Sequence, residues 1–207
     1  MNLANKLTLL RVFLVPVFVV FMAIDTFWCN IFALIIFIIA SITDYYDGVV
    51  ARQQNTVTTF GVFLDPLADK LLITSAFVSF VAIPALQIPA WMVIAIIARE
   101  FIITGLRSLG SSKSVIIPAN IFGKVKTTSQ ITAIITILVI LITESILMKF
   151  FKMTQYDLFE MTGWQYLAGW LLINLPYWLM FVVTILTLYS GINYIFQNKD
   201  VFRDSQK

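Results

Sequence analysis

Histidine is absent from the 207-residue sequence, and cysteine occurs once, as Cys29. The lack of imidazole excludes histidine acid–base catalysis, phosphohistidine intermediates and histidine-ligated zinc. A single thiol excludes an intramolecular disulfide and cannot by itself form a thiolate metal site. Any chemistry in this chain must therefore use carboxylates, lysine, arginine, tyrosine and hydroxyl groups.

Charged residues are also scarce, at 12% of the chain, with a formal net charge of +3. The sequence pI is about 9.0. This weak positive surplus fits contact with anionic lipid headgroups or phosphorylated substrates, and it is too small to indicate nucleic acid.

Hydrophobic residues make up 60% of the chain, which includes 18 Phe, and the mean hydropathy is +0.92. Apolar runs recur along nearly the whole sequence, so no part of it reads as a separate soluble domain. We therefore expect one integral membrane domain over residues 1–207, with a short juxtamembrane segment at 1–6 and a polar tail at about 196–207.

A membrane-spanning helix needs about 20 mostly apolar residues. The sequence predicts an all-α fold with six transmembrane helices, at about 7–24, 27–43, 60–84, 89–109, 120–147 and 166–195. The first of these is too long for a signal-peptide core and lacks a cleavage pattern before Asp25, so we expect it to remain as an anchor. The aromatic segment from about 148 to 165 is expected at the outer interface.

Basic residues predict the orientation of these helices. They precede or begin the first helix, lie between the second and third, surround the connection between the fourth and fifth, and follow the sixth. The opposite connections carry few or balanced charges. By the positive-inside bias, both termini face the cytoplasm. The basic residues are Lys6, Arg11, Arg52, Arg107, Lys113, Lys124, Lys126, Lys199, Arg203 and Lys207.

Four of the 11 acidic residues lie in one stretch, Ser41 to Lys70. Asp44 and Asp47 are spaced i, i+3 and share a face near the end of the second predicted helix, whereas Asp65 and Asp69, at i, i+4, share a face near the start of the third. The linker from Arg52 to Thr59 is short, which predicts antiparallel neighbouring helices. The four carboxylates are then expected to converge at the cytoplasmic end of this hairpin.

Four clustered aspartates cannot all stay ionised near a low-dielectric interior without compensation. Divalent cations supply it, and oxygen ligands alone favour Mg²⁺ or Mn²⁺ over zinc. Four carboxylates can bridge two ions about 4 Å apart, and such a pair can polarise a phosphoryl group between them. The alternatives are a proton or cation pathway, or salt bridges to nearby bases such as Arg52, Lys70 and Arg99.

The same stretch reads D-x-x-D-G-x-x-A-R, then eight residues, then G-x-x-x-D-x-x-x-D, from Asp44 through Asp69. This pattern resembles the signature of the CDP-alcohol phosphatidyltransferase family at every fixed position. The resemblance implies a membrane enzyme with six transmembrane helices that acts as a homodimer. It also implies that Asp44, Asp47, Asp65 and Asp69 hold a two-metal centre of Mg²⁺ or Mn²⁺.

Further roles follow from the resemblance alone. Asp69 would also be the general base. Gly48 and Arg52 would contact the cytidine diphosphate part of the donor, CDP-diacylglycerol, and Gly61 would let the nucleotide approach the third helix. Thr58 is the candidate for a donor-binding hydroxyl, with Thr56 or Thr59 as substitutes. Asn5, Thr8 and Arg11 lie on one broad side of the first helix and are candidates to close the site, or else ordinary caps and interface anchors.

The acceptor alcohol depends on two other stretches. AREFIITGLR places Arg99, Glu100 and Arg107 on the fourth predicted helix, and GKVKT places Lys124 and Lys126 at the start of the fifth. Such bases suit an acceptor phosphate, because guanidinium binds it in bidentate fashion and ammonium as a point charge. They are also what the positive-inside bias requires. Glu100 points about 100° away from Arg99 on an ideal helix and need not be its partner.

These two stretches, with DPLADK and the opening NKLTLLR, resemble the bacterial branch of the family that uses glycerol phosphate. We therefore expect transfer of a phosphatidyl group from CDP-diacylglycerol to sn-glycerol 3-phosphate, with release of CMP, at the cytoplasmic side of a bacterial plasma membrane. The close alternative is another acceptor, such as inositol phosphate, serine or phosphatidylglycerol. A small cation or proton transporter is the alternative from another class, although the inverted repeats typical of many transporters are absent from the sequence.

Overall fold

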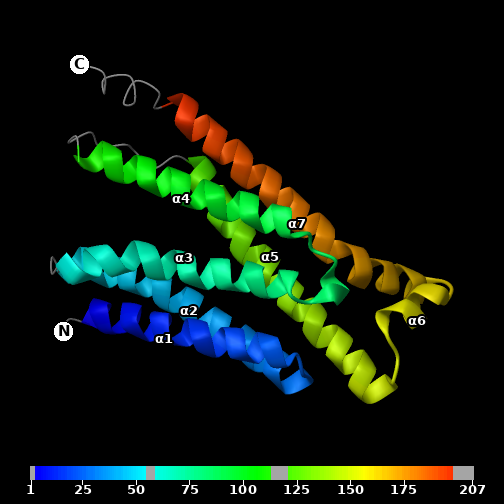
Figure 1. Cartoon of the computed structure of the whole chain (residues 1–207). Coiled ribbons are helices and arrows are strands. Elements are labelled where there is room, and N and C mark those ends of the chain that lie inside the picture. The colour runs from blue at the N-terminus through cyan, green and yellow to red at the C-terminus, as the bar shows by residue number, and fades with distance from the viewer. Residues whose placement is uncertain (1–2, 55–58, 113–120, 198–207) are drawn as a thin grey trace.

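The computed structural model describes residues 3–54, 59–112 and 121–197, with side chains at 8–43, 68, 70–110, 123 and 125–197. Six long helices and one short one account for most of this part of the chain, and it contains no strand (Figure 1). The long helices are α1 (Leu3–Ile24), α2 (Phe27–Gln54), α3 (Thr59–Val81), α4 (Ala90–Ser112), α5 (Ile121–Ile146) and α7 (Trp164–Gln197).

The all-α prediction is confirmed for the described residues, and each of the six predicted segments overlaps one long helix. Two helices are long and apolar enough to cross a membrane by length and composition, Val125–Phe151 and Trp164–Gln197. Shorter apolar stretches lie at Thr8–Ile24, Phe27–Thr43 and Lys70–Val81.

Two predicted boundaries were wrong. The second helix was expected to end at about residue 43, where the apolar run stops, but α2 continues to Gln54. An α-helix satisfies its backbone hydrogen bonds internally. It can therefore continue with polar side chains beyond the apolar run, where water replaces lipid. The third helix was expected to reach residue 84 and ends at Val81, because Pro84 starts a 3₁₀ turn and a proline disfavours helix in the residue before it.

Helix α1 packs along both α2 and α3, which contact each other at few positions. Helix α7 packs against α4 and α5, and α5 also contacts α2, so the two groups of helices share one core. Buried apolar side chains fill that core, among them Phe18, Phe37, Phe77, Met92 and Met180. The start of α1, the end of α2, the start of α3 and the end of α7 lie at the same end of the bundle (Figure 1).

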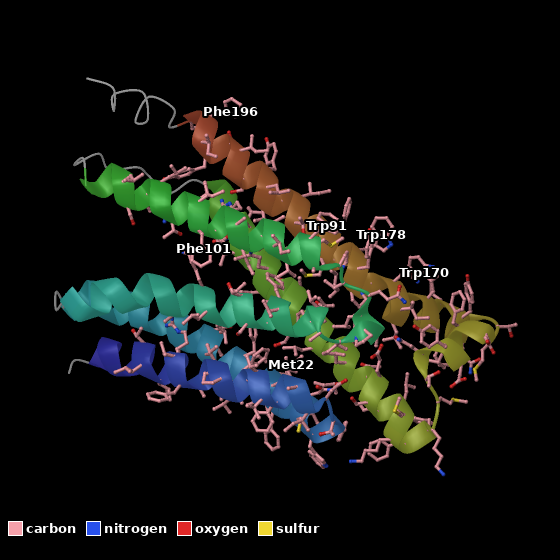
Figure 2. The ribbon with its side chains drawn as sticks, viewed as in Figure 1. Met22, Trp91, Phe101, Trp170, Trp178 and Phe196 are labelled. Carbon is pink, nitrogen blue, oxygen red and sulfur yellow. The ribbon has the colours of Figure 1, made fainter. Side chains whose placement is uncertain are left out.

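Large apolar side chains also cover the outside of the bundle. Phe101 is 61% exposed, and Phe196 is 70% exposed. Trp170, Trp178 and Phe196 lie along the outer side of α7 (Figure 2). A surface with so many exposed apolar side chains exceeds the patches that a soluble monomer shows, and it fits a lipid environment.

The opposite end of the bundle holds the segment expected at the outer interface. Helix α5 continues as a π-helix, Leu147–Phe151, and α6 (Gln155–Glu160) then begins with a capping box between Thr154 and Asp157. Helix α6 lies directly on α7, because a Cβ at Gly169 would meet the backbone nitrogen of Phe159 at 2.5 Å. Only glycine permits this approach.

Candidate functional site

The four predicted carboxylates lie on α2 and α3. Asp47 lies seven residues before the end of α2, and Asp65 lies six residues after the start of α3, so each is about 10 Å along its helix from the α2–α3 connection. Asp44 and Asp69 are each ten residues from it, at about 15 Å. The backbone therefore places one aspartate of each helix at each of two matching depths. We call α2 from Asp44 onward and α3 up to Asp69 the carboxylate hairpin.

Several predicted site residues have side chains outside the described part of the structure. Their backbones belong to α1, α2, α3 or α5, except for Thr58, which lies wholly outside the described residues. Among the side chains that are described, no three His, Cys, Asp or Glu residues form a group that could hold a metal ion. The residues concerned are Asn5, Asp44, Asp47, Gly48, Arg52, Thr58, Gly61, Asp65, Asp69 and Lys124.

Helix α1 brings two predicted residues to the carboxylate hairpin. Thr8 is 2% exposed and Arg11 is 1% exposed. They are spaced i, i+3 and share one face, and the helices that α1 mainly contacts are α2 and α3. Burying a guanidinium is costly unless it is paired and hydrogen-bonded. The packing of α1 therefore directs a buried cation toward the two helices that carry the aspartates.

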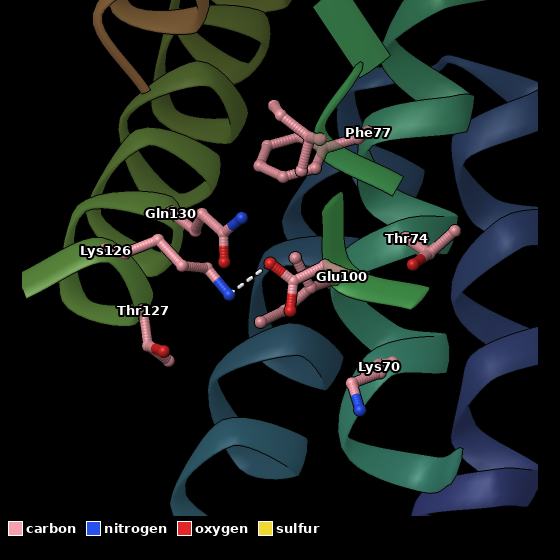
Figure 3. A pocket seen from close by; sticks show the side chains of 9 residues that line it. Lys70, Thr74, Phe77, Glu100, Lys126, Thr127 and Gln130 are labelled. Carbon is pink, nitrogen blue, oxygen red and sulfur yellow. Dashed lines mark ion pairs between the residues drawn. The ribbon is translucent and has the colours of Figure 1, made fainter. Parts of the chain in front are cut away.

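Two of the predicted basic residues of the acceptor site, Arg99 and Lys126, join Glu100 and Ser190 in a second group, which we call the charge cluster. The carboxylate of Glu100 pairs with the ammonium of Lys126, across from α4 to α5 (Figure 3). It also accepts from Arg99, at 3.2 Å from Nη1 to Oε1. The sequence left open whether Glu100 pairs with Arg99, and the structure shows that it does, because a long arginine side chain spans the 100° between neighbouring Cβ directions.

Arg99 is held from the other side by α7. Its Nη2 donates to Ser190 Oγ at 2.9 Å. A Cβ at Gly191 would lie 2.8 Å from Arg99 Cγ, so the arginine rests against the α7 backbone. The cluster thus joins three helices through one carboxylate and one guanidinium. Arg107 is not part of it and is exposed, about two turns farther along α4.

A cavity of about 30 Å³ lies beside the charge cluster and is lined from α3, α4 and α5. Its polar side chains are Lys70, Thr74, Glu100, Lys126, Thr127 and Gln130. Gln130 is 1% exposed, and its amide nitrogen has no hydrogen-bond partner among the described residues. Because Lys70 follows Asp69 in the chain, the cavity adjoins the carboxylate hairpin along α3.

Sequence reasoning missed two of these residues, Glu100 and Gln130. Gln130 lies one turn after Lys126 on α5, so i, i+4 spacing placed it on the same face. An uncharged polar residue four positions after a predicted ligand was the available signal. For Glu100, the signal was a lone acid between two arginines on a helix that is otherwise poor in charge.

Comparison with known proteins matches this chain to one family. The sequence model of a family described as CDP-alcohol phosphatidyltransferase matches residues 1–189. A Bacillus subtilis protein named CDP-diacylglycerol–glycerol-3-phosphate 3-phosphatidyltransferase is 44% identical over 149 residues, 66% of this chain and 76% of the relative. Proteins of the same name from Salmonella typhimurium and Escherichia coli K12 are 41% and 40% identical over 145 residues, 64% of this chain and 74% of each relative.

Proposed function

Because this chain belongs to the CDP-alcohol phosphatidyltransferase family, we propose that it transfers the phosphatidyl group of CDP-diacylglycerol to sn-glycerol 3-phosphate. The products are phosphatidylglycerophosphate and CMP, and the activity is that of a phosphatidylglycerophosphate synthase in phospholipid biosynthesis. The observation that carries this proposal is the identity of 40–44% to relatives named for that reaction. The buried bases beside α3 support it, since they suit an acceptor that carries a phosphate.

The enzyme acts at the bacterial plasma membrane, with six helices crossing the bilayer. The start of α1, the end of α2, the start of α3 and the end of α7 lie at one end of the bundle. Described basic residues such as Arg11 and Arg107 lie toward that end, whereas Lys149 and Lys152 lie at the other. The positive-inside bias assigns the end with Arg11 and Arg107 to the cytoplasm. A homodimer stays a prediction from the family resemblance.

Members of this family generally use divalent metal ions, and the donor set of the carboxylate hairpin fits two of them, Mg²⁺ or Mn²⁺. Four carboxylates offer only oxygen ligands, as these ions prefer. The backbone places Asp44 with Asp69, and Asp47 with Asp65, at matching depths. When bound, the ions neutralise charge on the pyrophosphate of the donor and stabilise CMP as the leaving group.

The chain's own residues then bind the donor and move one proton. Asp69 accepts the proton of the acceptor hydroxyl, whose oxygen attacks the phosphorus nearest the diacylglycerol as the bond from that phosphorus to the CMP oxygen breaks. The donor's acyl chains stay in lipid. Gly48, Arg52, Thr58, Gly61, Asn5 and Thr8 surround its cytidine diphosphate part.

The acceptor phosphate binds among the bases of α4 and α5. Lys126 is buried and lines the cavity beside α3. Arg99 shares the carboxylate of Glu100 with it and rests against α7, and Lys124 and Arg107 lie nearer the ends of their helices. Guanidinium and ammonium groups recognise phosphate by charge-assisted hydrogen bonds. This arrangement favours glycerol 3-phosphate, which carries a net negative charge, over an alcohol without net charge, such as zwitterionic serine.

One assay tests the proposal. Purified protein in detergent receives CDP-diacylglycerol and Mg²⁺ or Mn²⁺, with each alcohol in turn, and CMP release is measured. We expect release with glycerol 3-phosphate. Release with inositol phosphate or serine alone would overturn the acceptor assignment, and no release with any alcohol would overturn the enzyme activity itself.

A further inference from the structure

Glu100 lies where three helices meet and has a role that the reaction above does not use. Its carboxylate pairs with Lys126 of α5 and with Arg99 of α4, and Arg99 is anchored to Ser190 of α7. The Glu100 side chain is 15% exposed, and that of Lys126 is 8% exposed. Ionic groups so far from water persist only when they are paired. Glu100 therefore fixes where the Lys126 ammonium lies.

The charged side chains that line the cavity, together with Arg99, which pairs with Glu100 from outside the lining, leave a positive surplus. Lys70, Arg99 and Lys126 contribute three cations and Glu100 one anion, a net +2 from these four side chains. A phosphate monoester carries about −1.5 to −2 at pH 7. The surplus therefore matches one doubly charged phosphate, whereas a cluster without the carboxylate would carry one positive charge more than that ligand can neutralise.

The shape of the cavity indicates from which side such a ligand approaches. Its volume of about 30 Å³ is that of roughly one water molecule, so a whole phosphate does not fit inside. Lys70 and Lys126 lie toward the ends of α3 and α5 that adjoin the α2–α3 connection, whereas Phe77 closes the other side (Figure 3). A phosphate is therefore held at the Lys70–Lys126 rim, and a hydroxyl or water fills the cavity.

Gln130 is a second, independent sign that the cavity receives a polar ligand. Its amide nitrogen is buried, lines the cavity and has no partner among the described residues. A buried donor without a partner destabilises the fold, and a bound hydroxyl or water removes that penalty. The cavity therefore offers one hydrogen-bond donor below a rim that binds an anion.

We propose that Glu100 is a positioning residue for the acceptor, which holds Lys126 at the rim of this cavity so that the site takes a doubly charged phosphate monoester. This inference rests on the proposed function for the identity of that ester, glycerol 3-phosphate. Glu100 does not touch the reacting atoms. It acts through Lys126, and through Arg99 it ties that ammonium to α7.

The test compares Glu100→Gln with wild type and with the matched control Glu160→Gln, an exposed position on α6 at the other end of the bundle. CMP release is measured against glycerol 3-phosphate concentration. We expect Glu100→Gln to raise KM for glycerol 3-phosphate about tenfold and to change kcat less than threefold, and Glu160→Gln to change neither. An unchanged KM, or a fall in kcat alone, would overturn the positioning role.

Thermal stabilisation by glycerol 3-phosphate gives a readout without turnover. We expect this ligand to raise the melting temperature of wild type and of Glu160→Gln, and to raise that of Glu100→Gln markedly less. If Glu100→Gln does not fold, Glu100→Asp is tested instead. Its shorter carboxylate is expected to raise KM for glycerol 3-phosphate about threefold. A wild-type KM together with a wild-type melting shift in Glu100→Asp would overturn the proposal.

The two proposals fail in different ways. If wild type is stabilised by glycerol 3-phosphate and Glu100→Gln is not, but neither releases CMP, the proposed function fails and the phosphate site stands. If wild type releases CMP and Glu100→Gln matches it in KM, kcat and melting shift, the proposed function stands and the role of Glu100 fails.

Discussion

The carboxylate hairpin and the charge cluster lie next to each other along α3 and carry opposite surpluses of charge. The hairpin places four aspartates on two helices joined by a short connection. The charge cluster places two cations, on α4 and α5, around one carboxylate and anchors the cation of α4 to Ser190 of α7. A region with surplus negative charge must receive cations, and a region with surplus positive charge must receive an anion. This difference is why we propose the metal ions for the hairpin and the acceptor phosphate for the charge cluster.

Removal of divalent metal is expected to have the largest effect and to act on one region only. With a chelator, CMP release should fall to background, since about 10⁴-fold or more of the rate depends on charge neutralisation of this kind. Mg²⁺ or Mn²⁺ should restore it. The melting shift produced by glycerol 3-phosphate should persist in chelator, because the charge cluster needs no metal. If chelation abolishes the melting shift, glycerol 3-phosphate binding depends on the metal, and the two regions form one site.

Asp69→Asn is expected to have the next largest effect. Loss of a general base costs about 10²–10⁴ in rate, so CMP release should fall at least about 10²-fold, while stabilisation by CDP-diacylglycerol remains measurable. Asp157→Asn, on the exposed cap of α6, is the matched control and should keep wild-type turnover. Retained turnover in Asp69→Asn would remove this residue from the role of base.

These two predictions rest on what the sequence itself allowed. The carboxylate hairpin could be predicted because its ligands lie within 26 residues, on two helices whose i, i+3 and i, i+4 spacing is local. The charge cluster could be predicted only in part. The bond from Arg99 to Ser190 joins residues 91 positions apart, and no local pattern places α7 beside α4.

The boundaries of the helices were predictable where the sequence changes its chemistry sharply. Pro84 and the apolar run before it place the end of α3 to within a few residues. The end of α2 was missed by 11 residues, because hydropathy reports where lipid ends and not where a helix ends. Helix α6 was missed as a separate element, since a helix of six residues has little periodicity to detect.

Gly191→Ala is expected to disturb the charge cluster and leave the hairpin intact. The added Cβ would lie 2.8 Å from Arg99 Cγ, close to the base of the side chain, so Arg99 must move away from Ser190. Overpacking of this kind costs about 1–3 kcal/mol, and a lower melting temperature with a KM raised a few-fold should follow. Gly105→Ala, where nothing lies within 4 Å, should instead be neutral or slightly stabilising. Equal melting temperatures for the two variants would contradict the packing of Arg99 on α7.

The smallest expected effect lies at the other end of the bundle, outside both regions. The backbone N–H and the hydroxyl of Thr154 both donate to Asp157 and hold the pKa of its carboxyl below the ordinary value of 3.8. Because the folded pKa is depressed, the stabilisation is present above about pH 4 and is lost as the pH falls through the folded pKa. The melting temperature of wild type should exceed that of Asp157→Asn at neutral pH, and the gap should close in acid. A gap that does not depend on pH would contradict this.

The two glycines of α7 together have a mechanical consequence. Gly169 seats the backbone of α6, and Gly191 seats Arg99; they lie 22 residues apart, or about 33 Å along the helix axis, close to the thickness of the hydrocarbon core of a bilayer. Most of α7 therefore lies between two points of close packing whose separation matches that thickness. A helix packed closely at two distant points cannot change its tilt freely. The 34-residue helix α7 is therefore expected to resist tilting in response to bilayer thickness.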